Sequence, residues 1–169
     1  MDFTVIQGDI ATQSADALVN AAGTSLQMGS GVAGALRRGA NGPINQEAVS
    51  KGPVDLGGVA VTDAYDLDAE YVIHAAAMPH DDDRRATEES IREATRNSLE
   101  RAEELDCQSV VMPILGTGAA GFDLETGAHL VCSEVWHYDA STLEDVRIIA
   151  YSDPEYEALV EIADDIRSS

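Results

Sequence analysis

Apolar residues along the chain follow two patterns, short uninterrupted runs and longer stretches with helical spacing. Residues 71–75 and 109–115 are short apolar runs, typical of strands that are buried on both faces of a sheet. Between 91 and 105, apolar residues instead recur every three or four positions, opposite acids and arginines, which indicates an amphipathic helix. On these criteria we expect strands at 3–7, 17–20, 58–62, 71–75, 109–115 and 146–151, and helices at 31–38, 43–50, 91–105, 123–138 and after a cap at Ser152.

The order of these elements predicts the fold class. Strands and helices alternate along all 169 residues without an internal repeat or a low-complexity linker. Such a series predicts one α/β domain over residues 1–169, with three layers (α/β/α) and a mixed, mostly parallel central sheet. Ligands of these folds bind at the carboxyl ends of the strands, so the loops at those ends are the first place to look for a site.

The charge of the chain excludes two classes of partner. There are 31 Asp and Glu against 10 Lys and Arg, a formal net charge of −21. Such a surface repels the phosphates of a nucleic-acid duplex and an anionic membrane, so we expect neither as a partner. The acids are scattered through the chain, which we interpret as adaptation to high salt; an ordinary acidic protein is the alternative.

No segment predicts export, membrane insertion or a bound metal. No run approaches about 18 apolar residues, and the first residues lack the basic and apolar parts of a secretory signal, so we expect a cytoplasmic protein. Cys107 and Cys132 lack the spacing of a zinc site and are expected to be small apolar side chains. His80 precedes three acids at 81–83, which we interpret as a solvated run. We therefore expect neither a metal nor a cofactor.

Two glycine-rich loops carry the most chemical information. Residues 29–34 and 116–121 both have the pattern GxGxxG; the first opens a predicted helix and the second follows a buried strand. Glycine lets the backbone approach a ligand closely, and successive free N–H groups can bind an anion. Neither loop contains Lys or Arg, so we expect backbone donors to supply any affinity for phosphate.

Other interpretations of these loops can be compared with the spacing of known nucleotide-binding motifs. Each loop alone can be an ordinary glycine-rich turn. The absence of GK[ST] excludes a P-loop nucleotidase. For a dinucleotide fingerprint, Gly29 lies too far beyond the strand that ends near Asn20, and no acid ends a strand about 20 residues after the second loop. A nicotinamide dehydrogenase is therefore disfavoured.

Taken in order, several motifs resemble the macrodomain family. They are Gly8-Asp9-Ile10, the run DALVNAA at 16–22, residues 29–36, Val72-Ile73-His74 and residues 113–122. Each motif is weak alone, but the resemblance runs from about residue 3 to residue 166. It implies the macrodomain fold and binding of ADP-ribose, and in some members hydrolysis of its derivatives or linkages.

The resemblance also implies roles for individual residues. Asp9 matches the acid that accepts a hydrogen bond from the adenine amino group, although a helix cap is the simpler explanation. Tyr151 matches an aromatic residue placed against adenine, with a core tyrosine as the alternative, and His74 is expected to be structural. The expected ADP-ribose contacts are Asp9, Ile10, Asn20, Ala22, Gly31, Val32, Ala33, Gly116, Thr117, Gly118, Ala119, Ala120, Gly121, Phe122 and Tyr151.

Two departures from the family pattern bear on catalysis. Hydrolytic members usually carry a second Asn where this chain has Gly23, and many carry an Asp where it has Ala33. The first change removes an amide that contacts the distal ribose, for which Thr24 or Ser25 could substitute, and the second removes a candidate base.

We therefore expect a protein that binds ADP-ribose, free or attached to a protein. The alternatives are a hydrolase of ADP-ribose 1″-phosphate, O-acetyl-ADP-ribose or mono-ADP-ribosylated protein, and a protein that binds another adenine nucleotide or a single-stranded RNA end. Positioning of a substrate by the backbone can by itself lower the activation barrier for hydrolysis. The sequence therefore identifies no catalytic residue.

Overall fold

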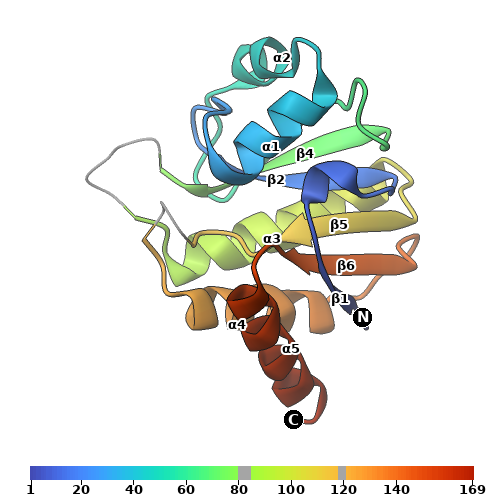
Figure 1. The fold of residues 1–169 in the computed structure, drawn as a ribbon, viewed down its shortest axis with the longest axis vertical. Helices are drawn as coiled ribbons and strands as arrows, with labels where there is room; N and C mark the ends of the chain where they lie inside the picture. Colours follow the sequence, from blue (N-terminus) through green and yellow to red (C-terminus); the bar gives the residue numbers. More distant parts are fainter. Residues whose placement is uncertain (80–84, 118–120) are drawn as a thin grey trace.

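Six strands in the described residues form one sheet in the order β1-β6-β5-β2-β4-β3 (Figure 1). The computed structural model describes residues 1–79, 85–117 and 121–169. The strands are β1 (Thr4–Gln7), β2 (Ala17–Gly23), β3 (Val59–Asp63), β4 (Tyr71–Met78), β5 (Ser109–Pro113) and β6 (Asp145–Ala150). The helices are α1 (Gly31–Ala40), α2 (Ile44–Lys51), α3 (Glu88–Glu104), α4 (Leu124–Trp136), α5 (Asp153–Arg167) and the 3-10 helix η1 (Ile10–Thr12).

The sheet is mixed and mostly parallel, as the sequence predicts. β1, β6, β5, β2 and β4 run parallel to one another, and only β3 is antiparallel, pairing with β4. The carboxyl ends of the five parallel strands therefore meet at one edge of the sheet.

Helices cover both faces of this sheet, which confirms the three-layer prediction (Figure 1). Successive β2 side chains point to opposite faces: Leu18 packs with Leu36 of α1, whereas Val19 packs in a larger cluster with Leu99 of α3 and with residues of α4 and α5. None of the helices in the described ranges combines the length and the apolar character that crossing a bilayer requires.

Strand ends differ from the predicted ones where small residues carry little signal. β2 continues to Gly23 and β4 to Met78, past the predicted ends at 20 and 75, through alanines that pair across the two strands up to a bulge beside Gly23. Alanine has a low strand propensity, so these residues form strand because they pair with the neighbouring strand rather than from local preference. β5 ends at Pro113, two positions before the predicted end, although Leu115 remains buried.

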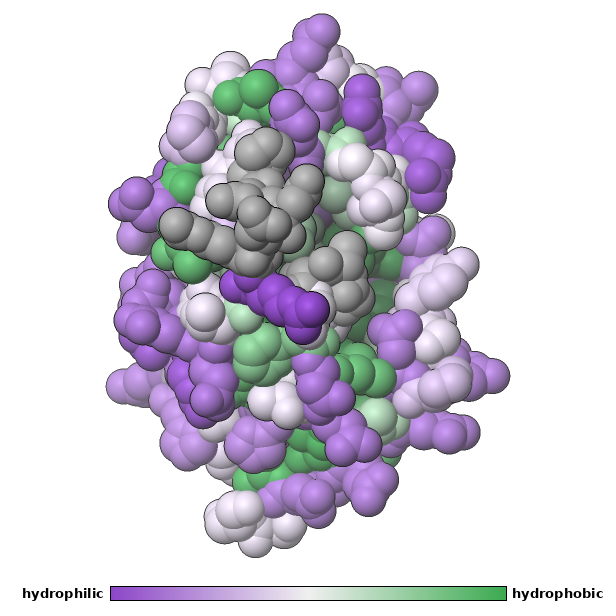
Figure 2. Space-filling model, turned by 90° about the vertical axis from the view of Figure 1, so that its left-hand side faces the viewer, coloured by the Kyte–Doolittle hydropathy of each residue, from purple (hydrophilic) through white to green (hydrophobic). Residues whose placement is uncertain are grey.

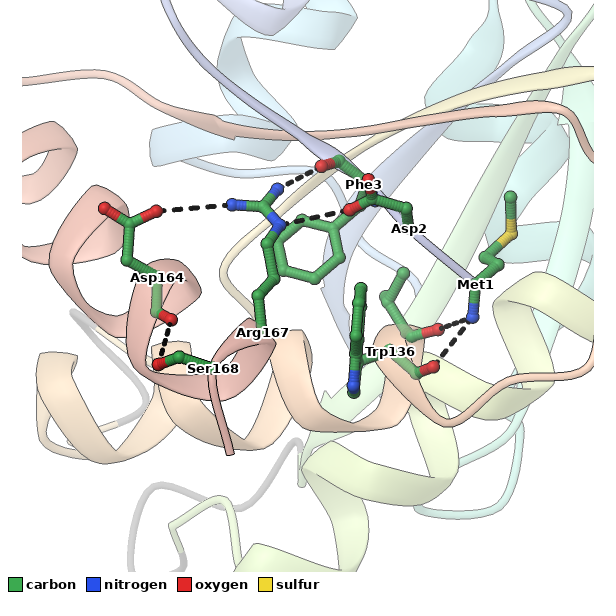
Figure 3. Close-up of polar contacts among 8 residues, drawn as sticks. Met1, Asp2, Phe3, Trp136, Asp164, Arg167 and Ser168 are labelled. Atoms are coloured by element: carbon green, nitrogen blue, oxygen red, sulfur yellow. Dashed lines mark hydrogen bonds and ion pairs between the residues drawn. The ribbon is translucent and has the colours of Figure 1, made fainter.

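Arg167 at the end of α5 holds the beginning of the chain (Figure 3). Its guanidinium lies 4.4 Å from the centroid of the Phe3 ring and donates to the Phe3 carbonyl. Its Nε lies 3.0 Å from Asp2 Oδ1, and its Nη1 lies 3.6 Å from a carboxylate oxygen of Asp164. The amino group of Met1 donates at 2.7–3.0 Å to three carbonyls at and just after the end of α4. These contacts attach β1, an edge strand, to two helices.

A chain of buried polar side chains crosses three strands on the face covered by α1 and α2. Nδ2 of Asn20 in β2 lies 3.0 Å from Nδ1 of His74 in β4, and Nε2 of His74 lies 2.9 Å from Oγ1 of Thr62 in β3. The Thr62 hydroxyl donates its one hydrogen to the Asp63 carbonyl, so it accepts from His74. This network assigns the proton of a neutral His74 to Nε2. Burial lowers the pKa of His74 to about 4, which keeps the ring neutral.

Replacing Arg167 with alanine tests the attachment of β1. We expect R167A to lower the free energy of unfolding by about 1–2 kcal/mol, because the cation–π contact and the hydrogen bonds are lost together. Urea denaturation measures this change. R101A is the matched control, because the Arg101 guanidinium forms an ion pair with exposed Glu104 on its own helix and its loss should change stability by less than about 0.5 kcal/mol. Equal effects of the two changes would contradict the assignment.

His74 makes the stability of the fold depend on pH. Its pKa is about 4 when folded and 6.5 when unfolded, so the unfolded chain binds the proton more tightly. The contribution of neutral His74 is therefore present above pH 6.5 and is lost as the pH falls toward 4. We expect the parent to lose about 1–2 kcal/mol more than H74Q between pH 7.5 and pH 5, because the carboxylate contributions cancel in this comparison. Parallel pH profiles of unfolding free energy for the two proteins would contradict a buried, neutral His74.

Candidate functional site

The carboxyl edge of the sheet gathers the loops that the sequence singles out. Asp9 follows β1, Tyr151 follows β6, the second glycine loop follows β5, and the first glycine loop follows β2 before α1 begins. Since β2 and β5 are neighbouring parallel strands, both glycine loops emerge from the same edge. Figure 2 looks onto this side of the molecule and shows apolar surface among strongly polar side chains.

Asp9 and Tyr151 form one corner of this edge. β1 and β6 pair up to Gln7 and Ala150, and the Gly8 N–H then donates to the Ala150 carbonyl at 3.0 Å. Asp9 follows Gly8 and Tyr151 follows Ala150, so both residues begin the loops that leave this pair of strands. Tyr151 is 75% exposed, which excludes the core tyrosine considered above. A carboxylate beside an exposed aromatic ring can bind a planar base that carries an amino group.

Asp9 is also a helix cap, the simpler of its two predicted roles. Its Oδ1 accepts from the Ala11 N–H at 2.9 Å at the start of η1, while Ile10 is buried. A carboxylate has two oxygens, so capping through Oδ1 is compatible with a ligand contact through Oδ2. Ile10 shares its apolar cluster with Ala33, which joins this corner to the first glycine loop.

The first glycine loop presents backbone donors at the start of α1. The first helical bond runs from the Gly34 N–H to the Ser30 carbonyl at 3.3 Å, so the N–H groups of Gly31, Val32 and Ala33 have no acceptor within the helix. Within the described residues, Ser30 makes no capping bond through its side chain. Gly31 has a φ of +62°, a conformation that favours glycine.

Met28, just before the first glycine loop, is held by hydrogen bonds to α2 and α1. Its N–H donates to Asn45 of α2 at 2.8 Å, and its carbonyl accepts from the Arg37 guanidinium at 3.1 Å. The Met28 side chain is buried. The donors at the start of α1 therefore belong to a loop that is fixed at its base, a form of preorganisation.

The two ends of the second glycine loop contact each other at residues 116–117 and 122, which we call the neck of the loop. The Phe122 N–H donates to the Gly116 carbonyl at 3.2 Å, and Thr117 and Phe122 form an isolated bridge. Gly116 has a φ of +79°, and a Cβ there would lie 2.6 Å from the Ile91 side chain, so only glycine fits. Asp123 then caps α4 through the Thr126 N–H. The predicted contacts Gly118, Ala119 and Ala120 lie outside the described residues.

Two predicted contact residues have their side chains in the core instead. Asn20 is fully buried and its amide is bonded to His74; no donor among the described residues reaches its Oδ1. Ala22 packs in a small cluster with Leu26 and Ala48. Both occupy β2, where side chains point to one face of the sheet rather than along it toward the edge. Their contact with a ligand stays a prediction, whereas the structural role of His74 is clear.

Sequence reasoning missed one residue at this edge, Arg85. Its Cδ and Nε lie 3.1 and 3.2 Å from where a Cβ on Gly121 would be, so its side chain lies directly against the second glycine loop. Arg85 belongs to the connection between β4 and α3, which leaves the sheet at the same edge. The position of this connection at the carboxyl edge could have indicated Arg85, but only once the order of the strands is known.

A shallow cavity of about 580 Å³ lies elsewhere, at the outer edge of β3. There Lys51 donates to the Val61 carbonyl and forms an ion pair with Glu47, whose Oε1 accepts from the Asp63 N–H. These contacts satisfy the free backbone groups of an edge strand, so we assign them a structural role. Among the described residues no cluster of His, Cys, Asp and Glu could hold a metal ion; His80 and the acids at 81–83 lie outside them.

Comparisons with known proteins identify relatives over the whole chain. An uncharacterized protein of Saccharolobus solfataricus is 37% identical, across 98% of this chain and 94% of its own length. A macrodomain variant of Oceanobacillus iheyensis, solved with ADPR, superposes with a TM-score of 0.88 at 21% identity, covering 98% of this chain and 93% of that one. A Trypanosoma brucei macrodomain in complex with ADP-ribose gives a TM-score of 0.83 at 24% identity, covering 93% and 67%.

A protein-family model also matches this chain. The model described as "Macro domain" matches residues 19–131, from the middle of β2 into α4, and this range includes both glycine loops. The chain belongs to the macro domain family.

Proposed function

We propose that this chain binds ADP-ribose, free or attached to a protein, along the carboxyl edge of its sheet. The observation that carries the proposal is the placement of two glycine loops beside a corner with an acid and an exposed aromatic ring. A ligand with a base at one end, a diphosphate in the middle and a sugar at the other end matches this order of groups. The complexes of the Oceanobacillus and Trypanosoma relatives with ADPR and ADP-ribose support it.

Each part of the ligand has a matching group. Adenine stacks on Tyr151 and donates from its amino group to Asp9, an arrangement that discriminates against bases without that donor. The diphosphate accepts from the N–H groups at 31–33 and from those of the second loop, which needs no side-chain charge. The distal ribose lies near Phe122, which is partly buried at the neck of the second loop.

We further propose binding rather than hydrolysis as the main activity. Gly23 provides no amide to orient the distal ribose, and Ala33 provides no base. Among the other candidates, Ser25 Oγ accepts from the Gln27 N–H at 3.3 Å and so closes its own turn. Without an amide at 23 and a base at 33, catalysis of ester or phosphate cleavage would depend mainly on backbone positioning.

Changing Asp9 to asparagine tests the base contact without removing the cap. The amide oxygen of D9N can still accept from Ala11, but its NH₂ would face the adenine amino group, donor against donor. We expect ADP-ribose binding to weaken by about 1–3 kcal/mol and the preference for ADP over inosine diphosphate, which carries an acceptor at that position, to fall or reverse. Isothermal calorimetry with the three ligands measures both effects.

D145N is the matched control for this experiment, because Asp145 lies at the opposite end of β6 and carries the same charge. It should leave all three affinities unchanged. If the parent shows no heat with millimolar ADP-ribose, the proposed function is wrong. If the parent binds and D9N keeps the same base preference, adenine is not recognised by Asp9.

Restoring the missing amide tests the assignment of binding over hydrolysis. Gly23 does not have a left-handed φ, and the nearest atom to a Cβ there is the Met78 carbonyl oxygen at 3.5 Å, an ordinary contact, so the backbone accepts a side chain at this position. We expect the parent to leave ADP-ribose 1″-phosphate and O-acetyl-ADP-ribose intact over hours. We expect G23N to bind ADP-ribose more tightly, by about 0.5–1.5 kcal/mol for one added hydrogen bond. Rapid turnover by the parent, followed by phosphate release or chromatography, would contradict this assignment.

A further inference from the structure

We propose that Arg85 is a phosphate-binding residue of this site, a side-chain cation that lies against Gly121 and adds to the backbone donors at the start of α1. This inference rests on the proposed function, because it assigns a role in binding the same ligand. It replaces the expectation that phosphate affinity comes from the backbone alone.

The backbone beside Arg85 is fixed by the start of α3. Thr87 and Ser90 form a capping box: the Ser90 N–H donates to Thr87 Oγ1 at 3.0 Å, and the Thr87 N–H donates to Ser90 Oγ at 2.8 Å. The Ser90 hydroxyl also donates to the Ala77 carbonyl of β4 at 2.7 Å. Arg85 therefore stands two residues before a cap that is tied to a central strand of the sheet.

Contacts on both sides of the neck hold this segment against the second loop. A Cβ on Gly116 would lie 3.1 Å from the Ala86 side chain, and one on Gly121 would lie 3.1 Å from Arg85 Cδ. Ala86 is buried, whereas Arg85 is exposed. Gly121 has a φ of +77°, so the missing side chain serves both the backbone turn and the approach of Arg85. The Arg85 side chain thus lies against the loop from Cγ to Nε, while the residue as a whole remains exposed.

Electrostatics favours a cation at this position. ADP-ribose carries a diphosphate, and the protein around it has a formal charge of −21, so the long-range field opposes binding. A guanidinium is planar and can donate two parallel hydrogen bonds to phosphate oxygens. Two arginines lie at the first loop: Arg37 donates to the Met28 carbonyl, and Nη1 of Arg38 lies 3.2 Å from where a Cβ on Gly34 would be. Arg85 is the arginine seen in contact with the second loop among the described residues.

The test compares R85Q and R85K with the parent on three ligands: ADP-ribose, ADP and adenosine. If Arg85 binds phosphate, R85Q should weaken ADP-ribose and ADP by similar factors of about 10 to 100, the range for a lost hydrogen bond to a charged group. Adenosine, which has no phosphate, should bind R85Q as it binds the parent. R85K should recover part of the loss, because lysine keeps the charge but not the planar fork.

R101Q is the control, since it removes the same charge from exposed Arg101 near the other end of α3. Its affinities should match those of the parent, as should the melting temperatures of all variants. Unchanged ADP-ribose affinity in R85Q with a binding parent would overturn the role of Arg85 and leave the proposed function standing. An equal loss for adenosine would also overturn it, because the effect would not act on phosphate. Absence of ADP-ribose binding by the parent would instead remove the proposed function, and this inference with it.

Discussion

The direction of the strands is the constraint on which the site depends. Five strands of the sheet run parallel, so the chain leaves each of them at the same edge. Parallel pairing of these strands brings residues as distant in sequence as Asp9, Gly31, Gly116 and Tyr151 to that edge. A one-position shift of any strand would move its loop and turn its side chains to the other face. The buried chain from Asn20 through His74 to Thr62 ties three of the strands in one register.

Backbone donors suit the charge of this protein. Acids outnumber basic residues 31 to 10, and a site built from many lysines would have to compete with carboxylates for each of them. The N–H groups at the start of α1 carry a partial positive charge that belongs to the backbone and does not depend on a basic side chain. They are also fixed by the fold, so little conformational entropy is lost when an anion binds. In our proposal, Arg85, whose side chain lies against the second loop, adds one directional charge beside these backbone donors.

Local patterns predict the elements, while contacts across the fold decide much of the site. The amphipathic spacing before Leu105 and the apolar run after Ser109 predict α3 and β5, because each pattern is complete within a few residues. The glycine loops were likewise found from local spacing. The burial of Asn20 was not, since a polar residue in a strand is accommodated only when partners such as His74 lie on the neighbouring strand. Arg85 was missed for the same reason: its contact with Gly121 depends on the strand order, which no local motif encodes.

One ligand, in our proposal, contacts both glycine loops and the corner that holds Asp9 and Tyr151. Amide chemical shifts of the ¹⁵N-labelled protein, followed by NMR during titration with ADP-ribose, test this arrangement. We expect the amides of Gly31, Val32, Ala33, Thr117, Gly121 and Tyr151 to shift together with one dissociation constant. Amides at the opposite edge, such as those of Asp145 and Ser109, should stay unchanged. Shifts confined to one loop, or gathered around Lys51 and Val61 at the outer edge of β3, would contradict it.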